Sequence, residues 1–373
     1  MTGVHRRRPK ASSRSLAAAI APVLLLCSLV LGAPSPAHAA VAGTWVPTAN
    51  KLTAGRADAG AVRLQDGKVL VAGGCADSWT ADLYDPATSM FTPTGDMHDR
   101  RCDFTAVRLR NGTVLAAAGY NTFNEVDLRT AEVYHPRTGA WTQTGSLHYA
   151  RGGYAAAMLG TGSVLVAGGQ SNSQVALPSA EVFQPKGGKW HLIPNMTADR
   201  FEAAAVVLPD GRVLVAGGLD DSYARLASAE IYDPRAHSWT PTGSMNVARG
   251  AFRATLLPDG TVLVAGGSTG GGPTAAAEIY HPATGIWTPT QSMSIERDEN
   301  TATLLKDGTV LVAGGQDAQY NKLDTAETYD PASGTWALTP TMNYAHWEHA
   351  GVRLEDGTVL IAGPNTDAEL YVP

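Results

Sequence analysis

The sequence predicts an all-β fold, a seven-bladed β-propeller with four-stranded antiparallel blades. Three observations lead to this prediction. One phrase recurs seven times at intervals of 45 to 50 residues, each copy contains short apolar segments separated by turn residues, and the two ends of the chain carry complementary parts of one copy. A period of this length is typical of a supersecondary unit that is stacked many times.

The first 39 residues precede the repeats and have the features of a secretory signal peptide. A basic segment is followed by the apolar run 16–31 and by Ala37-His38-Ala39, a typical cleavage site. We therefore expect residues 1–39 to be removed, residues 40–373 to form the propeller, and the protein to be secreted. The segment contains five of the 28 basic residues and none of the 34 acidic ones, so the remaining chain is strongly acidic. Such a chain is not expected to bind nucleic acid or an anionic membrane.

Residues 200–240 illustrate one repeat. Two apolar segments flank Pro209-Asp210-Gly211, and Asp-Gly between such segments indicates a tight hairpin. Gly217-Gly218 ends the second segment, a loop leads to the third at 229–232, and the fourth contains Trp239. Each repeat is therefore expected to form a four-stranded antiparallel meander.

The ends of the chain indicate how the ring closes. The chain after residue 39 begins with a lone fourth strand around Trp45 and ends with a lone third strand at 368–371. A linear stack would need polar caps at its ends, whereas pairing these two strands completes a seventh blade and removes open sheet edges. We expect residues 44–47 to pair with residues 368–372.

Three recurring features of the repeat resemble the kelch motif: the Gly-Gly pair, a Tyr in the third strand and a Trp in the fourth. The resemblance extends over residues 43–373 and implies a kelch-type propeller. The departures from the motif are Ala118-Gly119, Phe91, Phe183 and Gly363-Pro364.

Galactose and glyoxal oxidases are kelch propellers with a mononuclear copper, for which the family places a Tyr-His pair and a Tyr linked to Cys where inner strands begin. The corresponding positions here contain no Tyr-His pair; they are Ala57-Asp58, Cys102-Asp103, Gly152-Gly153, Phe201-Glu202, Gly250-Ala251, Asp298-Glu299 and Trp347-Glu348. Copper(II) prefers imidazole ligands, and the clustered His346 and His349 are expected on opposite sides of a strand. We therefore expect no metal and no cofactor.

An acidic residue recurs in every third strand. These residues are Asp82, Glu132, Glu181, Glu230, Glu278, Glu327 and Glu369. We interpret them as buried hydrogen-bond acceptors that hold each blade together, rather than as catalytic acids.

Charged residues also recur where each first strand begins. One position holds Arg56, Arg101, Arg151, Arg200, Arg249, Arg297 and His346, and the position two residues later holds Asp58, Asp103, Gly153, Glu202, Ala251, Glu299 and Glu348. Because residues two apart on a strand share a side, we expect the arginines to face these carboxylates around the mouth of the central channel. The pairs lock neighbouring blades together, form a polar binding site to which Tyr154 would contribute, or do both.

Two repeats lack the acidic residue, which would leave Arg151 and Arg249 free for an anionic ligand.

Function is expected on the face that carries the longer connections. The segments before the first strands and the loops after the second strands should share that face. The loops contribute the aromatic residues Trp79, Tyr120, Phe123, Tyr223 and Tyr320. Cys75 and Cys102 lie there in neighbouring repeats, and in an oxidising compartment such a pair is expected to form a disulfide.

These features favour a secreted, monomeric binding or interaction module that recognises an extracellular glycan or protein on this face. The alternative is a carbohydrate-active enzyme in the polar channel, either similar in kind to the cofactor-free sialic-acid epimerases of the kelch type or a degenerate oxidase. Acid–base chemistry would require a carboxylate or His with a strongly shifted pKa in an open channel; a binding module would not.

Overall fold

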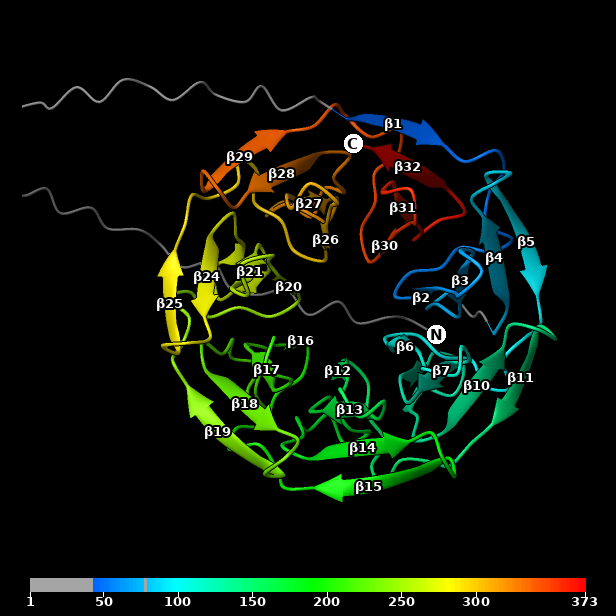
Figure 1. Cartoon of the computed structure of the whole chain (residues 1–373), viewed down its shortest axis with the longest axis horizontal. Helices are drawn as coiled ribbons and strands as arrows, with labels where there is room; N and C mark the ends of the chain where they lie inside the picture. Colours follow the sequence, from blue (N-terminus) through cyan, green and yellow to red (C-terminus); the bar gives the residue numbers. More distant parts are fainter. Residues whose placement is uncertain (1–42, 77–78) are drawn as a thin grey trace, which may run out of the picture. The chain divides into compact units, whose positions relative to one another are not determined.

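The structure is a computed structural model that describes residues 43–76 and 79–373, so the predicted signal peptide lies outside the described residues. These two ranges contain strands and turns but no helix, and therefore no helix that could cross a membrane. The strands form seven antiparallel four-stranded sheets around a common axis, as Figure 1 shows. The predicted seven-bladed β-propeller is confirmed.

The strands occupy four positions in each blade, from the axis outward. The innermost strands are β2 (Gly60–Arg63), β6 (Ala106–Arg108), β12 (Ala155–Met158), β16 (Ala204–Val207), β20 (Arg253–Leu256), β26 (Thr301–Leu304) and β30 (Ala350–Arg353). The second strands are β3 (Val69–Ala72), β7 (Val114–Ala117), β13 (Val164–Ala167), β17 (Val213–Ala216), β21 (Val262–Ala265), β27 (Val310–Ala313) and β31 (Val359–Ala362). The third strands are β4 (Ala81–Asp85), β10 (Ala131–His135), β14 (Ala180–Gln184), β18 (Ala229–Asp233), β24 (Ala277–His281), β28 (Ala326–Asp330) and β32 (Ala368–Val372). The outer strands are β5 (Met90–Thr94), β11 (Ala140–Gln143), β15 (Lys189–Ile193), β19 (Ser238–Thr242), β25 (Ile286–Pro289), β29 (Thr335–Leu338) and β1 (Thr44–Pro47).

The last blade is assembled from both ends of the described chain. Strand β1 pairs antiparallel with β32, with Trp45 opposite Tyr371, and the two strands lie side by side in Figure 1. The Trp45 indole also donates to Thr339 Oγ1 of the preceding blade at 3.2 Å. The ring therefore closes through the predicted strands, and no blade is left with an unpaired fourth position.

The hydrophobic core lies within and between the blades. The Val-Leu-Val-Ala segments of the second strands are completely buried, and one cluster joins Leu165 of β13 to Val213 of β17 in the next blade. The third and outer strands add a Tyr–Trp pair, as between Tyr134 and Trp141 with ring centroids 5.1 Å apart. The Trp141 indole N–H donates to the Gly95 carbonyl of the preceding blade at 2.9 Å. The polar end of the Trp side chain therefore links adjacent blades, while its ring packs against Tyr134.

The glycines after the second strands are required by close backbone packing. Gly217 has a φ of +65°, and a Cβ atom there would lie 2.5 Å from the Arg249 carbonyl oxygen. A side chain is therefore excluded by both conformation and space. This close approach brings the segment before the next inner strand against the end of the second strand.

Candidate functional site

The connections that enter the inner strands and the loops that leave the second strands meet on one face, called here the loop face. The Cys75 backbone N–H of one loop donates to the Ala57 carbonyl of a connection at 2.8 Å. Cys75 and Cys102 form a disulfide with a Cα–Cα distance of 4.9 Å, which links two neighbouring blades on this face. Two short hairpins extend the loops: β8 (Tyr120–Asn121) with β9 (Val126–Asp127), and β22 (Ser268–Thr269) with β23 (Gly272–Pro273).

The recurring arginines do not face the channel, and the pairing predicted for them is wrong. Their side chains are fully buried, and each pairs with the acidic residue of the third strand in its own blade. The pairs are Arg56–Asp82, Arg101–Glu132, Arg151–Glu181, Arg200–Glu230, Arg249–Glu278 and Arg297–Glu327, at 2.8 to 3.3 Å. In the last blade, His346 Nε2 lies 3.1 Å from Glu369 Oε1.

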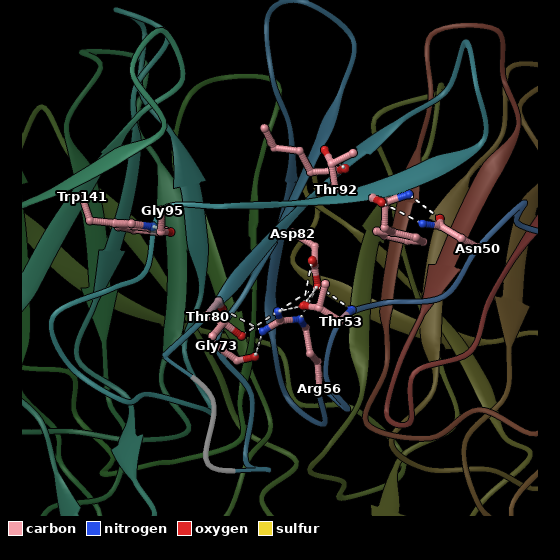
Figure 2. A network of polar contacts seen from close by, with 11 residues as sticks. Asn50, Thr53, Arg56, Gly73, Thr80, Asp82, Thr92, Gly95 and Trp141 are labelled. Atoms are coloured by element: carbon pink, nitrogen blue, oxygen red, sulfur yellow. Dashed lines mark hydrogen bonds and ion pairs between the residues drawn. The ribbon is translucent and has the colours of Figure 1, made fainter.

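Figure 2 shows this network in the first blade. Arg56 donates through Nε and Nη2 to Asp82 Oδ2 at 3.1 and 2.8 Å. Its Nη1 donates to the carbonyls of Gly73 and Thr80 at 3.0 and 2.7 Å, while the Thr53 backbone N–H donates to the same carboxylate at 3.2 Å. One guanidinium thus fastens the incoming connection to the second and third strands.

The third-strand acids accept backbone N–H groups as well as the arginine, as predicted for structural acceptors. Glu132 accepts from the His98 and Asp99 N–H groups at 2.7 and 3.0 Å. Burial alone would raise the pKa of Glu132, but Arg101 and these donors hold it below its ordinary value. Arg151 and Arg249 are not free to bind an anion as expected, because each guanidinium already forms an ion pair, with Glu181 and Glu278 respectively.

The residues two positions after these arginines form a separate ring, called here the belt. All seven have a left-handed backbone, with φ between 47° and 60°; they are Asp58, Asp103, Gly153, Glu202, Ala251, Glu299 and Glu348. Their N–H groups donate to the carbonyl of the belt residue in the preceding blade at six of the seven steps, from 2.6 Å for Glu202 to Gly153 to 3.4 Å for Gly153 to Asp103. The belt is a circle of backbone hydrogen bonds at the centre of the loop face that carries five carboxylates.

The glycine in the belt brings two of these carboxylates towards each other. A Cβ atom on Gly153 would lie 3.2 Å from Asp103 Oδ2 and 3.8 Å from Glu202 Cγ. Asp103 and Glu202 therefore flank the same small residue. The repeat that has Gly153 in place of an acid is thus a place where the neighbouring acids converge.

The belt carboxylates have raised pKa values. Desolvation and the charge of Asp103 raise the pKa of Glu202 to about 7, and desolvation with the charges of Glu348 and Asp298 raises that of Glu299 to about 7. Desolvation and neighbouring carboxylates also raise the pKa of Asp58. The Asp103 and Glu202 residues are exposed to water, yet the protein atoms around their carboxyl groups displace part of the hydration shell and raise the pKa. This combination is expected for acids in a narrow space that water can enter.

Other charged side chains act on the belt. Asp127 and Asp298 add two carboxylates, each with a pKa raised to about 6 mainly by desolvation. The positive charges that lower the pKa values of these acids are Arg225, Arg253 and Lys322. Among the described residues named here, seven carboxyl groups stand against three cations, so the centre of the loop face is acidic.

Tyr154 was predicted to contribute to the channel mouth, but its side chain does not lie there. Its side chain is buried, and its hydroxyl donates to the Ala117 carbonyl of the preceding blade and accepts from the Thr105 N–H at 3.2 Å. The equivalent residues of the last two blades are Asn300 and His349, which are 2% and 5% exposed. His349 Nε2 lies 2.9 Å from Thr301 Oγ1, while His349 Nδ1 and Asn300 Oδ1 have no hydrogen-bond partner.

Aromatic side chains surround the belt on the loops. Trp79, Phe123, Tyr223 and Tyr320 are 44%, 69%, 47% and 73% exposed. The Arg100 guanidinium lies 4.6 Å from the Trp79 ring centroid and 4.8 Å from that of Phe123, and Lys322 lies 4.7 Å from that of Trp347. The loop face thus combines an acidic centre with an aromatic and cationic rim.

The comparisons with known proteins agree with this architecture. The kelch motif matches four segments, residues 151–197, 200–246, 249–294 and 300–343. The fold is similar to that of a fungal alcohol oxidase of the AA5 family in complex with copper, at 19% identity and a TM-score of 0.73 over 89% of this chain and 76% of that one. It is also similar to YjhT, at 12% identity and a TM-score of 0.63 over 78% of this chain and 99% of that one. No curated protein gives a significant match.

The described residues do not fit a copper site of the oxidase type. The belt positions supply carboxylates, and Cys102, which lies before one inner strand, is already bonded to Cys75 in the disulfide. His346 uses both ring nitrogens, towards the Gly363 carbonyl and Glu369. Within 43–76 and 79–373, no three His, Cys, Asp or Glu side chains are grouped closely enough to hold a metal ion.

Proposed function

We propose that this kelch-repeat β-propeller is an exported, monomeric binding module whose loop face recognises an extracellular ligand, either a glycan or a protein, and that a glycan fits the site better. The observation that carries the proposal is the combination of five belt carboxylates at the centre of the face with exposed aromatic side chains around it. Nucleic acid and anionic membranes are not expected partners, because the centre of the face repels them. Export rests on the signal-peptide features of residues 1–39.

Both parts of the face suit a polyhydroxylated ligand. Carboxylates accept hydrogen bonds from hydroxyl groups through two oxygens each, and exposed aromatic rings such as Phe123 and Tyr320 offer apolar surfaces to sugar rings. The belt is also held rigidly, because backbone hydrogen bonds join its residues from blade to blade. Rigid placement lowers the entropic cost of binding.

A glycan array probed with the secreted protein tests the proposal. We expect binding to a restricted class of glycans and loss of that binding in Phe123→Ala. Ile286→Ala, which removes a 56% exposed apolar side chain from outer strand β25, is the matched control and should bind as the parent does. No binding to any glycan, together with capture of a defined extracellular protein through Phe123, would instead assign the face to a protein partner.

A second function is favoured by one observation, the pKa of about 7 for Glu202 and Glu299. A carboxylic acid that titrates near neutral pH can both donate and accept a proton, as general acid–base catalysis requires. The channel would then carry out a proton-transfer reaction on a carbohydrate without a cofactor. Incubation of the array hits with the protein, followed by NMR, separates the two functions: a new sugar species formed by the parent but not by Glu202→Gln indicates an enzyme.

A further inference from the structure

Two loops of the loop face have the same backbone hydrogen bonds and carry a tyrosine at the equivalent position. In the fourth blade, Asp220 Oδ1 accepts from two backbone N–H groups at 2.8 and 3.0 Å, and the Tyr223 N–H donates to the Asp220 carbonyl at 2.8 Å. In the sixth blade, Asp317 Oδ1 accepts from two backbone N–H groups, both at 2.9 Å, and the Tyr320 N–H donates to the Asp317 carbonyl at 2.8 Å. Each loop is therefore a preformed turn that fixes the direction of one tyrosine.

Both tyrosines have a backbone conformation that bulky residues rarely adopt. The φ angle is +59° at Tyr223 and +62° at Tyr320, in the left-handed region that Gly and Asn tolerate and that strains other residues. A tyrosine at such a position lowers stability unless its side chain makes contacts that offset the strain.

Tyr223 makes such contacts within the fold, and Tyr320 does not. The Tyr223 ring lies edge-on to Phe201 with the centroids 5.5 Å apart, and its hydroxyl accepts from Gln170 Nε2 at 2.9 Å. In the sixth blade, Asp298 stands at the position of Phe201. The Tyr320 side chain is 73% exposed, and in the described part of the chain it has no hydrogen bond and no aromatic contact. Contacts that offset the strain at Tyr320 must therefore come from another molecule.

The loop that carries Tyr320 borders two carboxylates of the belt. A backbone bridge joins the residue before Glu299 to the start of this loop. Near the end of the loop, Lys322 Nζ lies 4.7 Å from the ring centroid of Trp347, the residue before Glu348. The exposed ring thus stands beside acceptors that the proposed function assigns to a glycan.

The loop face is lower on the side of the last blade, which is the neighbour of the sixth blade in the ring (Figure 1). The connection between the second and third strands spans residues 314–325 in the sixth blade but only 363–367 in the last blade. A shorter connection reaches less far from the ends of its strands. A ligand that starts at the belt can therefore extend past Tyr320 and leave the face over the last blade.

We propose that Tyr320 stacks on a sugar ring, and that the loop face binds a glycan chain which runs from the belt past Tyr320 rather than a single sugar. An exposed phenol ring offers an apolar surface to the C–H groups of a sugar, and the preformed turn lowers the entropic cost of holding it there. A chain contacts both the carboxylates and the ring, whereas a single sugar at the belt contacts the carboxylates alone. This inference rests on the proposed glycan-binding function and adds the size of the ligand.

The test is a glycan array on which glucose, galactose, mannose and N-acetylglucosamine are each printed as a series from one to six linked units. We expect the signal of the parent protein to rise with chain length. Tyr320→Asn keeps a residue that tolerates the left-handed backbone, and it should weaken the binding of the longer chains by roughly two- to tenfold, as expected for a lost stacking contact. Ile286→Ala, on outer strand β25, is the control and should bind as the parent does.

Melting temperatures give a second measurement that needs no ligand. Tyr320→Asn should melt at or above the parental temperature, because it removes strain and no internal contact. Tyr223→Asn, the same change in the matched loop, should melt lower because it loses Phe201 and Gln170. A Tyr320→Asn variant that melts as low as Tyr223→Asn would assign the ring to the fold and overturn the inference.

The array separates this inference from the function on which it rests. A parental signal that does not depend on chain length, or an unchanged profile in Tyr320→Asn, overturns the stacking role while leaving glycan binding intact. The absence of any signal from the parent overturns the proposed glycan binding and this inference with it.

Discussion

Replacing Arg151 by Ala should lower the free energy of unfolding, and this effect should not depend on any ligand. The side chain is fully buried and donates to four acceptors: the Gly168 carbonyl at 2.5 Å, the Ser179 carbonyl at 2.9 Å and hydroxyl at 3.1 Å, and Glu181 Oε1 at 3.0 Å. The Ala variant leaves the Glu181 charge buried without its counter-ion. Breaking a buried pair in this way costs about 3–5 kcal/mol, a large share of the roughly 5–15 kcal/mol that keeps a domain folded.

Urea unfolding followed by tryptophan fluorescence measures this cost, since the free energy of unfolding falls linearly with denaturant. The control is Arg137→Ala, which removes an exposed arginine from the turn between β10 and β11 and should change the free energy of unfolding by no more than about 0.5 kcal/mol. Arg151→Lys should lie between parent and Ala, because it keeps a charge but loses the planar fork. An Arg151→Ala variant with the parental urea midpoint would refute the structural role given to the buried pairs.

Three further predictions address closure, the disulfide and pH. Deleting β1 should destabilise the protein by at least the 3–5 kcal/mol or so expected for losing buried Trp45, and a truncated protein that melts like the parent would contradict closure. Replacing Cys75 and Cys102 by Ser should cost roughly 3–4 kcal/mol for a loop of 27 residues, while titration of the denatured, unreduced protein should find no free thiol. Folding raises the pKa of Glu202 and Glu299 from 4.5 to about 7, so the folded state binds more protons and the free energy of unfolding should fall as pH rises through that interval. The double Gln variant should flatten this pH dependence. If the urea midpoints of that variant change with pH as the parental ones do, the two carboxyl groups are not its cause.

Much of the fold was predictable because it depends on local patterns that the chain repeats. Asp-Gly turns, apolar segments and the Tyr–Trp pair recur in each unit, so the strand order and the closing pair β1–β32 follow from counting units. The buried acceptor role of the third-strand acids also follows from their occurrence in all seven repeats.

The arginine partners were not predicted correctly, although the sequence contains a signal for them. A basic residue and a third-strand acid occur together in all seven repeats, whereas the acid two residues after the arginine is missing in two of them. Two positions that are filled together in every repeat are better candidates for a pair. The rule that alternate residues share a side nevertheless favoured the nearer carboxylate.

What the sequence determined by itself is the number of blades, their strands and the positions that meet on the loop face. Only the tertiary structure decided which way the charged side chains turn. The alternation of sides holds for extended backbone, but Glu202 and the other belt residues have a left-handed φ. That turn of the backbone separates each arginine, directed into its blade, from the carboxylate that faces the axis. Hydrogen bonds between blades hold this turn. They join residues far apart in the chain and leave no mark in the local sequence.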